Sequence, residues 1–175
     1  MQKNKATSQN VVRLVVCGMM LALDVVLTRF GSVNLWDRRI GFSFIAVAIA
    51  AYLYGPLAGA LVHGSSDFIG AILFPSGAYF PGYTLTAAVI GLLYGLCFYR
   101  SNRWWRVALG VVSAQLVGSI LLNTLWISTT NSVPFWTLMP GRFVQAAIMT
   151  TVQLIVLPLV FAALKRGVQP LMKNG

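Results

Sequence analysis

Side chains that can do acid–base or ligand chemistry are few in this sequence. The 175 residues include three acidic side chains and one histidine, against thirteen lysines and arginines. The segment "HGSSDFIG" places His63 and Asp67 inside an apolar stretch. A carboxylate within a bilayer costs roughly 2.5–3.5 kcal/mol on insertion scales, so it marks a candidate functional site. Asp67 is therefore a candidate ligand contact, and a structural pair with an arginine or hydroxyl of a neighbouring helix is the alternative. For His63 we expect a hydrogen bond between helices rather than a metal or a proton relay.

Arginine supplies the other chemistry. Its planar guanidinium can bind a carboxylate through two parallel hydrogen bonds. Four arginines lie at the ends of apolar segments: Arg29, Arg38, Arg39 and Arg142. We interpret them as candidates for binding an anionic or polar ligand. The alternatives are pairing with Asp24 and Asp37, or extension toward lipid headgroups.

The composition indicates the class of protein to which these side chains belong. The chain is 58% hydrophobic and 9% charged, with a mean hydropathy of +0.78, whereas a soluble domain carries about 25% charged residues. No Asp, Glu, Lys or Arg occurs within 68–99, 107–141 or 143–164, and a membrane helix needs roughly 20 apolar residues. The sequence predicts an all-α integral membrane protein with a single transmembrane domain over residues 1–175. Cys17 and Cys97 have no metal-site or disulfide spacing, so no metal is expected.

Six helices are predicted, and breaks such as Gly55-Pro56 separate them. Their approximate ranges are Asn10–Phe30, Arg39–Tyr54, Leu57–Phe74, Pro81–Tyr99, Trp104–Ser128 and Pro140–Leu164. The second is short for a complete span. Residues 1–9 and 166–175 are expected to form short tails.

Basic residues set the orientation. With the N-terminus in the cytoplasm, nine of the thirteen basic residues lie inside, as the positive-inside rule requires. These nine are Lys3, Lys5, Arg13, Arg100, Arg103, Arg106, Lys165, Arg166 and Lys173. Both termini are then cytoplasmic, and the four arginines singled out above lie at the outer face. Because this explains the net charge of +10, no nucleic-acid partner is expected.

Aromatic and amide side chains accompany those arginines near the predicted outer ends. Phe80, Tyr83 and Trp126 can wall a flat ring, while Asn123 and Gln153 can hydrogen-bond to it. Aromatic walls with a few polar groups suit a planar heterocycle. The alternative is an aromatic belt at the membrane interface. In the first helix, Gly18 and Ala22 are four residues apart, a small-residue spacing that permits close approach of another helix.

In this combination the sequence resembles the substrate-binding S components of energy-coupling factor (ECF) vitamin transporters, and more narrowly the folate-specific ones. The matching segments are "LTRF" (27–30), "RIGFSFIA" (39–46), "GPLAG" (55–59), "DFIG" (67–70), "PSGAYFPGYTLTA" (75–87), "YG" (94–95), "LLNTLW" (121–126) and "MPGR" (139–142). Two departures concern the sixth helix: Gln145 and Ala146 replace a Lys-Asn pair, and Thr151 replaces a proline.

The resemblance implies a multi-pass protein of the bacterial plasma membrane that binds folate from outside. It implies one membrane coupling subunit and two ATPase subunits as partners, with Gly18 and Ala22 contacting the coupling subunit. The chain itself would be no enzyme and hold no cofactor, since ATP is hydrolysed by the partners and the chain has no GxxxxGK[ST] motif. The expected folate-binding residues are Arg29, Arg39, Asp67, Phe80, Tyr83, Asn123, Trp126, Arg142 and Gln153.

Other functions remain as alternatives. Within the same scaffold the ligand can be thiamine or riboflavin. A small proton-coupled transporter would use Asp24 or Asp67 as its proton carrier. A membrane enzyme is least favoured, because the sequence has no glutamate and no paired-carboxylate motif.

Overall fold

The structure is a computed structural model of the whole chain. It describes the backbone of residues 2–35, 38–75, 79–101, 103–131 and 133–173. Within these ranges the side chains of 2–8, 32–40, 131 and 167–173 are not described.

Helices dominate the described residues. In chain order the elements are α1 (Gln2–Arg29), β1 (Ser32–Leu35), β2 (Arg38–Gly41), α2 (Phe44–Tyr54), α3 (Pro56–Leu73), α4 (Pro81–Phe98), α5 (Trp104–Ala114), the π-helix η1 (Gln115–Asn123), α6 (Thr124–Asn131) and α7 (Phe135–Lys173). Five helical segments are long and apolar enough to cross a membrane: Gln9–Arg29, Pro56–Leu73, Pro81–Phe98, Trp104–Thr130 and Phe135–Arg166. With the shorter apolar α2, they correspond to the six predicted helices.

The start of the second helix was predicted wrongly. Residues 39–41, assigned to that helix, instead belong to β2, which pairs antiparallel with β1 from Ser32 opposite Gly41 to Leu35 opposite Arg38. The helix begins only at Phe44. A hairpin satisfies the backbone donors and acceptors of this connection by pairing its two arms, as a helix would do within one segment. The last helix also begins earlier than predicted, at Phe135 rather than Pro140.

Close helix packing rests on glycines of α3 and α4. A Cβ atom on Gly59 would run into the carbonyl oxygen of Gly91, and a Cβ on Gly91 would run into that of Gly59. Gly95 lies equally close to the backbone of Pro56. Without side chains at these positions the two helices pack backbone against backbone. These glycines of α3 and α4 therefore mark helix contacts within this chain.

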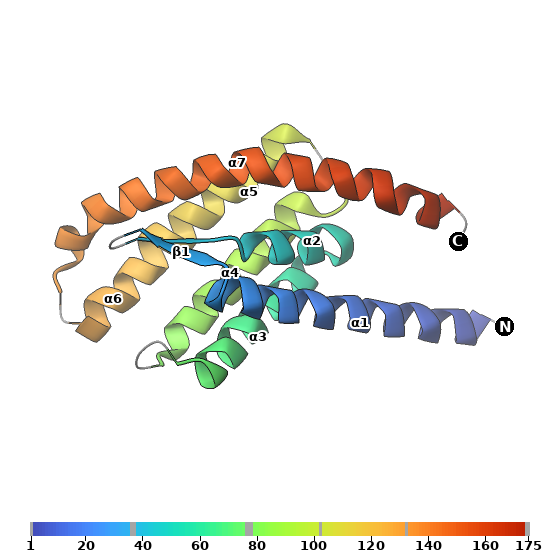
Figure 1. Cartoon of the computed structure of the whole chain (residues 1–175), viewed down its shortest axis with the longest axis horizontal. Helices are drawn as coiled ribbons and strands as arrows, with labels where there is room; N and C mark the ends of the chain where they lie inside the picture. Colours follow the sequence, from blue (N-terminus) through green and yellow to red (C-terminus); the bar gives the residue numbers. More distant parts are fainter. Residues whose placement is uncertain (1, 36–37, 76–78, 102, 132, 174–175) are drawn as a thin grey trace.

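The apolar core lies where α2, α4, α5 and α7 meet. Its buried residues are Phe44, Val47, Ala48, Ala51, Tyr94, Phe98, Val107, Val111, Ala114, Leu157 and Phe161. Figure 1 shows both termini at one end of the bundle. At the opposite end lie the hairpin, the end of α3, the start of α4, the end of α6 and the start of α7. This second end carries most of the predicted ligand-binding residues.

Candidate functional site

Three aromatic rings meet at the end of the bundle opposite the termini. Phe80 lies 5.4 Å from Trp126 and 6.2 Å from Tyr83, measured between ring centroids. We call these three residues the aromatic cluster. Trp126 Nε1 donates a hydrogen bond of 3.0 Å to Thr86 Oγ1, which fixes the indole against α4. Gly82 makes room for the cluster, because a Cβ atom there would collide with the Phe80 and Trp126 rings. The structure thus brings together three aromatic residues that the sequence singled out.

Asp67 lies on the adjoining part of α3. Its Oδ2 accepts a hydrogen bond of 2.8 Å from Thr84 Oγ1 of α4, and the Tyr79 hydroxyl lies 3.0 Å from the same threonine oxygen. The hydroxyl partner proposed as the alternative for Asp67 is therefore present. Arg29, at the end of α1, packs against α3: a Cβ atom on Gly70 would lie 3.1 Å from Arg29 Nε. Because Asp67 and Gly70 are three residues apart on one helix, they share a face, and this face carries Arg29 and Asp67 together.

A hollow, which we call the central cavity, lies between the helices and has a volume of about 100 Å³. Gln153 is buried beside it and accepts a 2.8 Å hydrogen bond from the Tyr94 hydroxyl. Its lining residues are Gly41, Ser43, Phe44, His63, Ile90, Tyr94, Ala114, Gln115, Ser119, Met149 and Gln153. The π-helix contributes two of them, Gln115 and Ser119, and such helices are frequent at functional sites. The predicted ligand contact Gln153 thus belongs to the central cavity and not to the aromatic cluster.

The remaining predicted contacts are more dispersed. Arg142 Nη1 donates a 3.4 Å hydrogen bond to Gln145 Oε1 of the same helix, so one of the two departures from the family pattern contacts a predicted ligand residue. Asn123 is half-buried at the last position of η1. Arg39 pairs with Asn34 in the hairpin register, and its side chain lies outside the described part of the structure.

A cluster of three polar side chains, which was not predicted from the sequence, joins α1 to α3. His63 Nδ1 lies 2.9 Å from Asp24 Oδ2, and the Ser66 hydroxyl contacts the same carboxylate oxygen. The expected interhelical hydrogen bond of His63 is confirmed. Its partner was not predicted, since Asp24 was considered only as an alternative partner for Arg29 or as the proton carrier of a coupled transporter. Among the described residues, no group of three His, Cys, Asp or Glu side chains is arranged to hold a metal ion.

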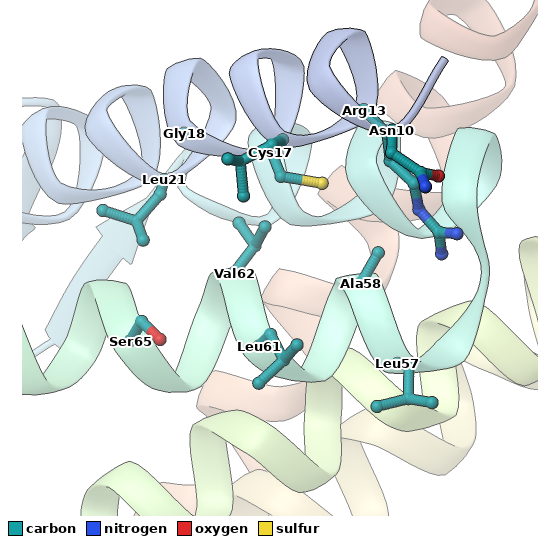
Figure 2. A pocket seen from close by; sticks show the side chains of 11 residues that line it. Asn10, Arg13, Cys17, Gly18, Leu21, Leu57, Ala58, Leu61, Val62 and Ser65 are labelled. Carbon is teal, nitrogen blue, oxygen red and sulfur yellow. The ribbon is translucent and has the colours of Figure 1, made fainter. Parts of the chain in front are cut away.

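An apolar groove of about 590 Å³ follows the other half of α1, where that helix faces α3. Figure 2 shows Cys17, Gly18 and Leu21 of α1 opposite Leu61 and Val62 of α3. A Cβ atom on Gly18 would meet nothing within 4 Å. Ala22, one turn further along α1, is exposed. Both small residues of the predicted partner motif are therefore exposed, and Gly18 lines the groove.

Comparisons with known proteins complete this description. Residues 12–168 match the family model described as "ECF transporter, substrate-specific component". The "Folate transporter FolT" of Clostridium novyi (strain NT) is 37% identical over 145 residues, which cover 82% of this chain and 84% of that relative. The "Folate transporter FolT" of Leuconostoc mesenteroides subsp. mesenteroides is 32% identical over 148 residues, covering 81% and 80%.

Solved structures agree with the sequence relatives. "Crystal structure of FolT bound with folic acid" matches with a TM-score of 0.76 at 29% identity, covering 84% of this chain and 90% of that one. The S component for biotin from an ECF-type ABC transporter matches with a TM-score of 0.66 at 16% identity, covering 89% and 93%. The second likeness concerns the fold alone, and both confirm the predicted helical fold class.

Proposed function

The chain belongs to the family of substrate-specific components of ECF transporters, and on this premise we propose that it binds folate. Five helices long and apolar enough to span a bilayer agree with a multi-pass membrane protein. The observation that carries the ligand assignment is the match, over 84% of the chain, to a FolT structure that contains folic acid. Relatives named as folate transporters at 37% and 32% identity support the same ligand.

The chemistry of the proposed site residues suits the two ends of a folate. A pterin is a flat heteroaromatic ring with adjacent N–H donors, and the aromatic cluster offers faces on which such a ring can stack. Asp67 supplies carboxylate oxygens, which accept hydrogen bonds from paired donors. Arg29, Arg39 and Arg142 supply guanidinium groups for the two carboxylates of the glutamate tail. Asn123 and Gln153 add amide groups that both donate and accept.

We assign partner binding to the groove along α1. Gly18 and Ala22 present almost bare backbone, and a helix of the membrane coupling subunit can approach closely there. In this proposal the chain captures folate at the outer face, with both termini in the cytoplasm. Energy comes from ATP hydrolysed by two ATPase subunits of the partner module, and the chain holds no cofactor of its own.

The test is to purify the chain alone, reconstitute it in nanodiscs, and titrate folate, thiamine, riboflavin and biotin. We expect nanomolar affinity for folate and at least a thousandfold weaker binding of the others. Arg39→Ala and Asp67→Ala should each weaken folate binding. Tight binding of another vitamin without folate binding would refute the ligand assignment. Proton-driven uptake by the chain without partners would contradict the proposed mode of transport.

A further inference from the structure

The polar cluster of Asp24, His63 and Ser66 has no role in the function proposed above. Asp24 is fully buried, at 0% exposure, while the His63 side chain keeps 19% of its surface exposed. Both donors that reach Asp24 converge on one oxygen, Oδ2. The other oxygen, Oδ1, is buried without a hydrogen-bond partner among the described residues. A bond that only joins two helices does not require a carboxylate, because a neutral amide costs less to bury.

His63 is also one of the residues that line the central cavity, together with Tyr94 and Gln153. Because its Nδ1 is taken up by Asp24 of α1, another part of His63 borders the cavity. At about 100 Å³ the cavity exceeds the roughly 10–15 Å³ that one water needs, yet it is smaller than a whole folate. It has room for the inner edge of a ring.

The same helices, α3 and α4, carry the central cavity at one level and the aromatic cluster with Asp67 about one turn away. His63 and Asp67 are four residues apart on α3, which is about 6 Å along a helix axis. On α4, Tyr83 and Thr86 lie at the level of the aromatic cluster. Ile90 of the same helix lines the central cavity one turn beyond Thr86. A flat ligand at the aromatic cluster whose edge extends one helical turn beyond Asp67 would come to the level of His63.

The hydrogen bond to Asp24 determines which nitrogen of His63 carries a proton. When the Asp24 carboxylate is ionised it only accepts hydrogen bonds, and Nδ1 of His63 is then the donor. In a neutral imidazole the second nitrogen is then an acceptor. Nε2 is the remaining ring nitrogen, and it can accept a hydrogen bond from an N–H or amine donor.

We propose that His63 reads the inner edge of the bound ligand through Nε2, and that Asp24 is its positioning residue. The inference rests on the proposed function and deepens it: the group read by His63 is a ring N–H or exocyclic amine of a heteroaromatic vitamin. Asp24 does not touch the ligand. It fixes the orientation and tautomer of the ring that does.

Nitrogen-15 NMR tests the tautomer directly, because His63 is the only histidine of the chain. In nanodiscs containing the chain labelled with ¹⁵N-histidine, we expect a neutral ring protonated at Nδ1. Addition of folate should shift the Nε2 resonance, and Asp24→Asn should change the tautomer population. A ring protonated at Nε2 alone, or at both nitrogens, would overturn the proposal. An Nε2 resonance left unchanged by folate at a concentration at which folate binds would overturn it as well.

Two substitutions of His63 separate a contact with the ligand from the hydrogen bond that joins α1 and α3. His63→Asn keeps a donor near the position of Nδ1 and loses the acceptor at Nε2, so it should weaken folate binding about tenfold, the loss of one hydrogen bond. His63→Gln places an amide near Nε2 and should bind folate more tightly than the asparagine variant. The control is Thr151→Ala on the exposed side of α7, whose hydroxyl bonds to Ala147 of its own helix. Wild-type affinity in His63→Asn would refute the role of Nε2.

A failure of the folate assignment can be distinguished from a failure of the role proposed for His63. If the wild-type chain binds another vitamin tightly and no folate, the ligand assignment fails. The same variants titrated with that vitamin still decide the role of His63: a selective loss in His63→Asn supports it, and equal affinities refute it. The ligand-free tautomer decides the role of Asp24 whichever vitamin is bound.

Discussion

Replacing Gly18 with leucine should separate folate binding from transport. In the isolated chain a Cβ atom at Gly18 would meet nothing within 4 Å, so the larger side chain enters the open groove of Figure 2 without a clash. Leucine also favours a helix over glycine by up to about 1 kcal/mol. We therefore expect unchanged folate affinity and an unfolding midpoint equal to or above that of the wild type.

The unfavourable effect of the leucine should appear only as a weaker affinity for the coupling subunit, when that subunit packs against α1. Forcing extra methylenes into a closely packed interface costs about 1–3 kcal/mol, which corresponds to an affinity loss of about 5–150-fold. Gly18→Ala keeps a small residue at this position and should retain most of the wild-type affinity for the partner module. The graded order of glycine, alanine and leucine distinguishes an interface from a general defect.

The assays are folate titration, thermal unfolding, co-purification with the coupling subunit, and ATP-driven folate uptake in proteoliposomes. The matched control is Gly59→Ala, because a Cβ atom there runs into the Gly91 carbonyl of α4. That variant should lose thermal stability whether or not the partner is present. Normal co-purification and uptake in Gly18→Leu would refute the assignment of this groove to the partner. Loss of stability in Gly18→Leu alone would show that the groove is closed in the free protein.

Three further substitutions test the ligand site and its support. Asp67→Ala should weaken folate binding by about 10–150-fold, the range for a hydrogen bond to a charged group, and an unchanged Kd in calorimetry would remove Asp67 from the site. Tyr94→Phe leaves the buried Gln153 oxygen without its 2.8 Å donor and should destabilise the fold by about 1–3 kcal/mol, measured as a lower denaturation midpoint. Trp126→Phe keeps an aromatic face and loses the 3.0 Å bond to Thr86; folate affinity should fall by about tenfold or less, and a loss beyond a thousandfold would contradict a stacking role.

Hydropathy and charge were enough to predict the spans of this fold. The charge-free runs are long enough to cross a bilayer. Within a bilayer, a helix satisfies all backbone hydrogen bonds inside one segment, so helical spans are expected. The hairpin escaped prediction because Arg38–Gly41 is a four-residue strand, and periodicity over so short a run does not separate a strand from the first turn of a helix. The π-helix Gln115–Asn123 also lay beyond prediction, because no local residue type in that segment demands the wider turn.

Pairings between helices were the hardest part to predict, and the polar cluster shows why. Asp24 and His63 are 39 residues apart, and their meeting depends on how α1 and α3 are rotated about their own axes. A rotation of α1 by one residue turns Asp24 about 100° away, since 3.6 residues complete a turn. The sequence can state that an intramembrane carboxylate needs a partner, but only packing selects which one.

Helix α1 contacts both regions of the bundle. Gly18 lies in the open groove, while Asp24, six residues later, is bonded to His63, which lines the central cavity. A movement of α1 induced at the groove would therefore displace His63 at the cavity, and the same helix would transmit partner binding to the ligand site.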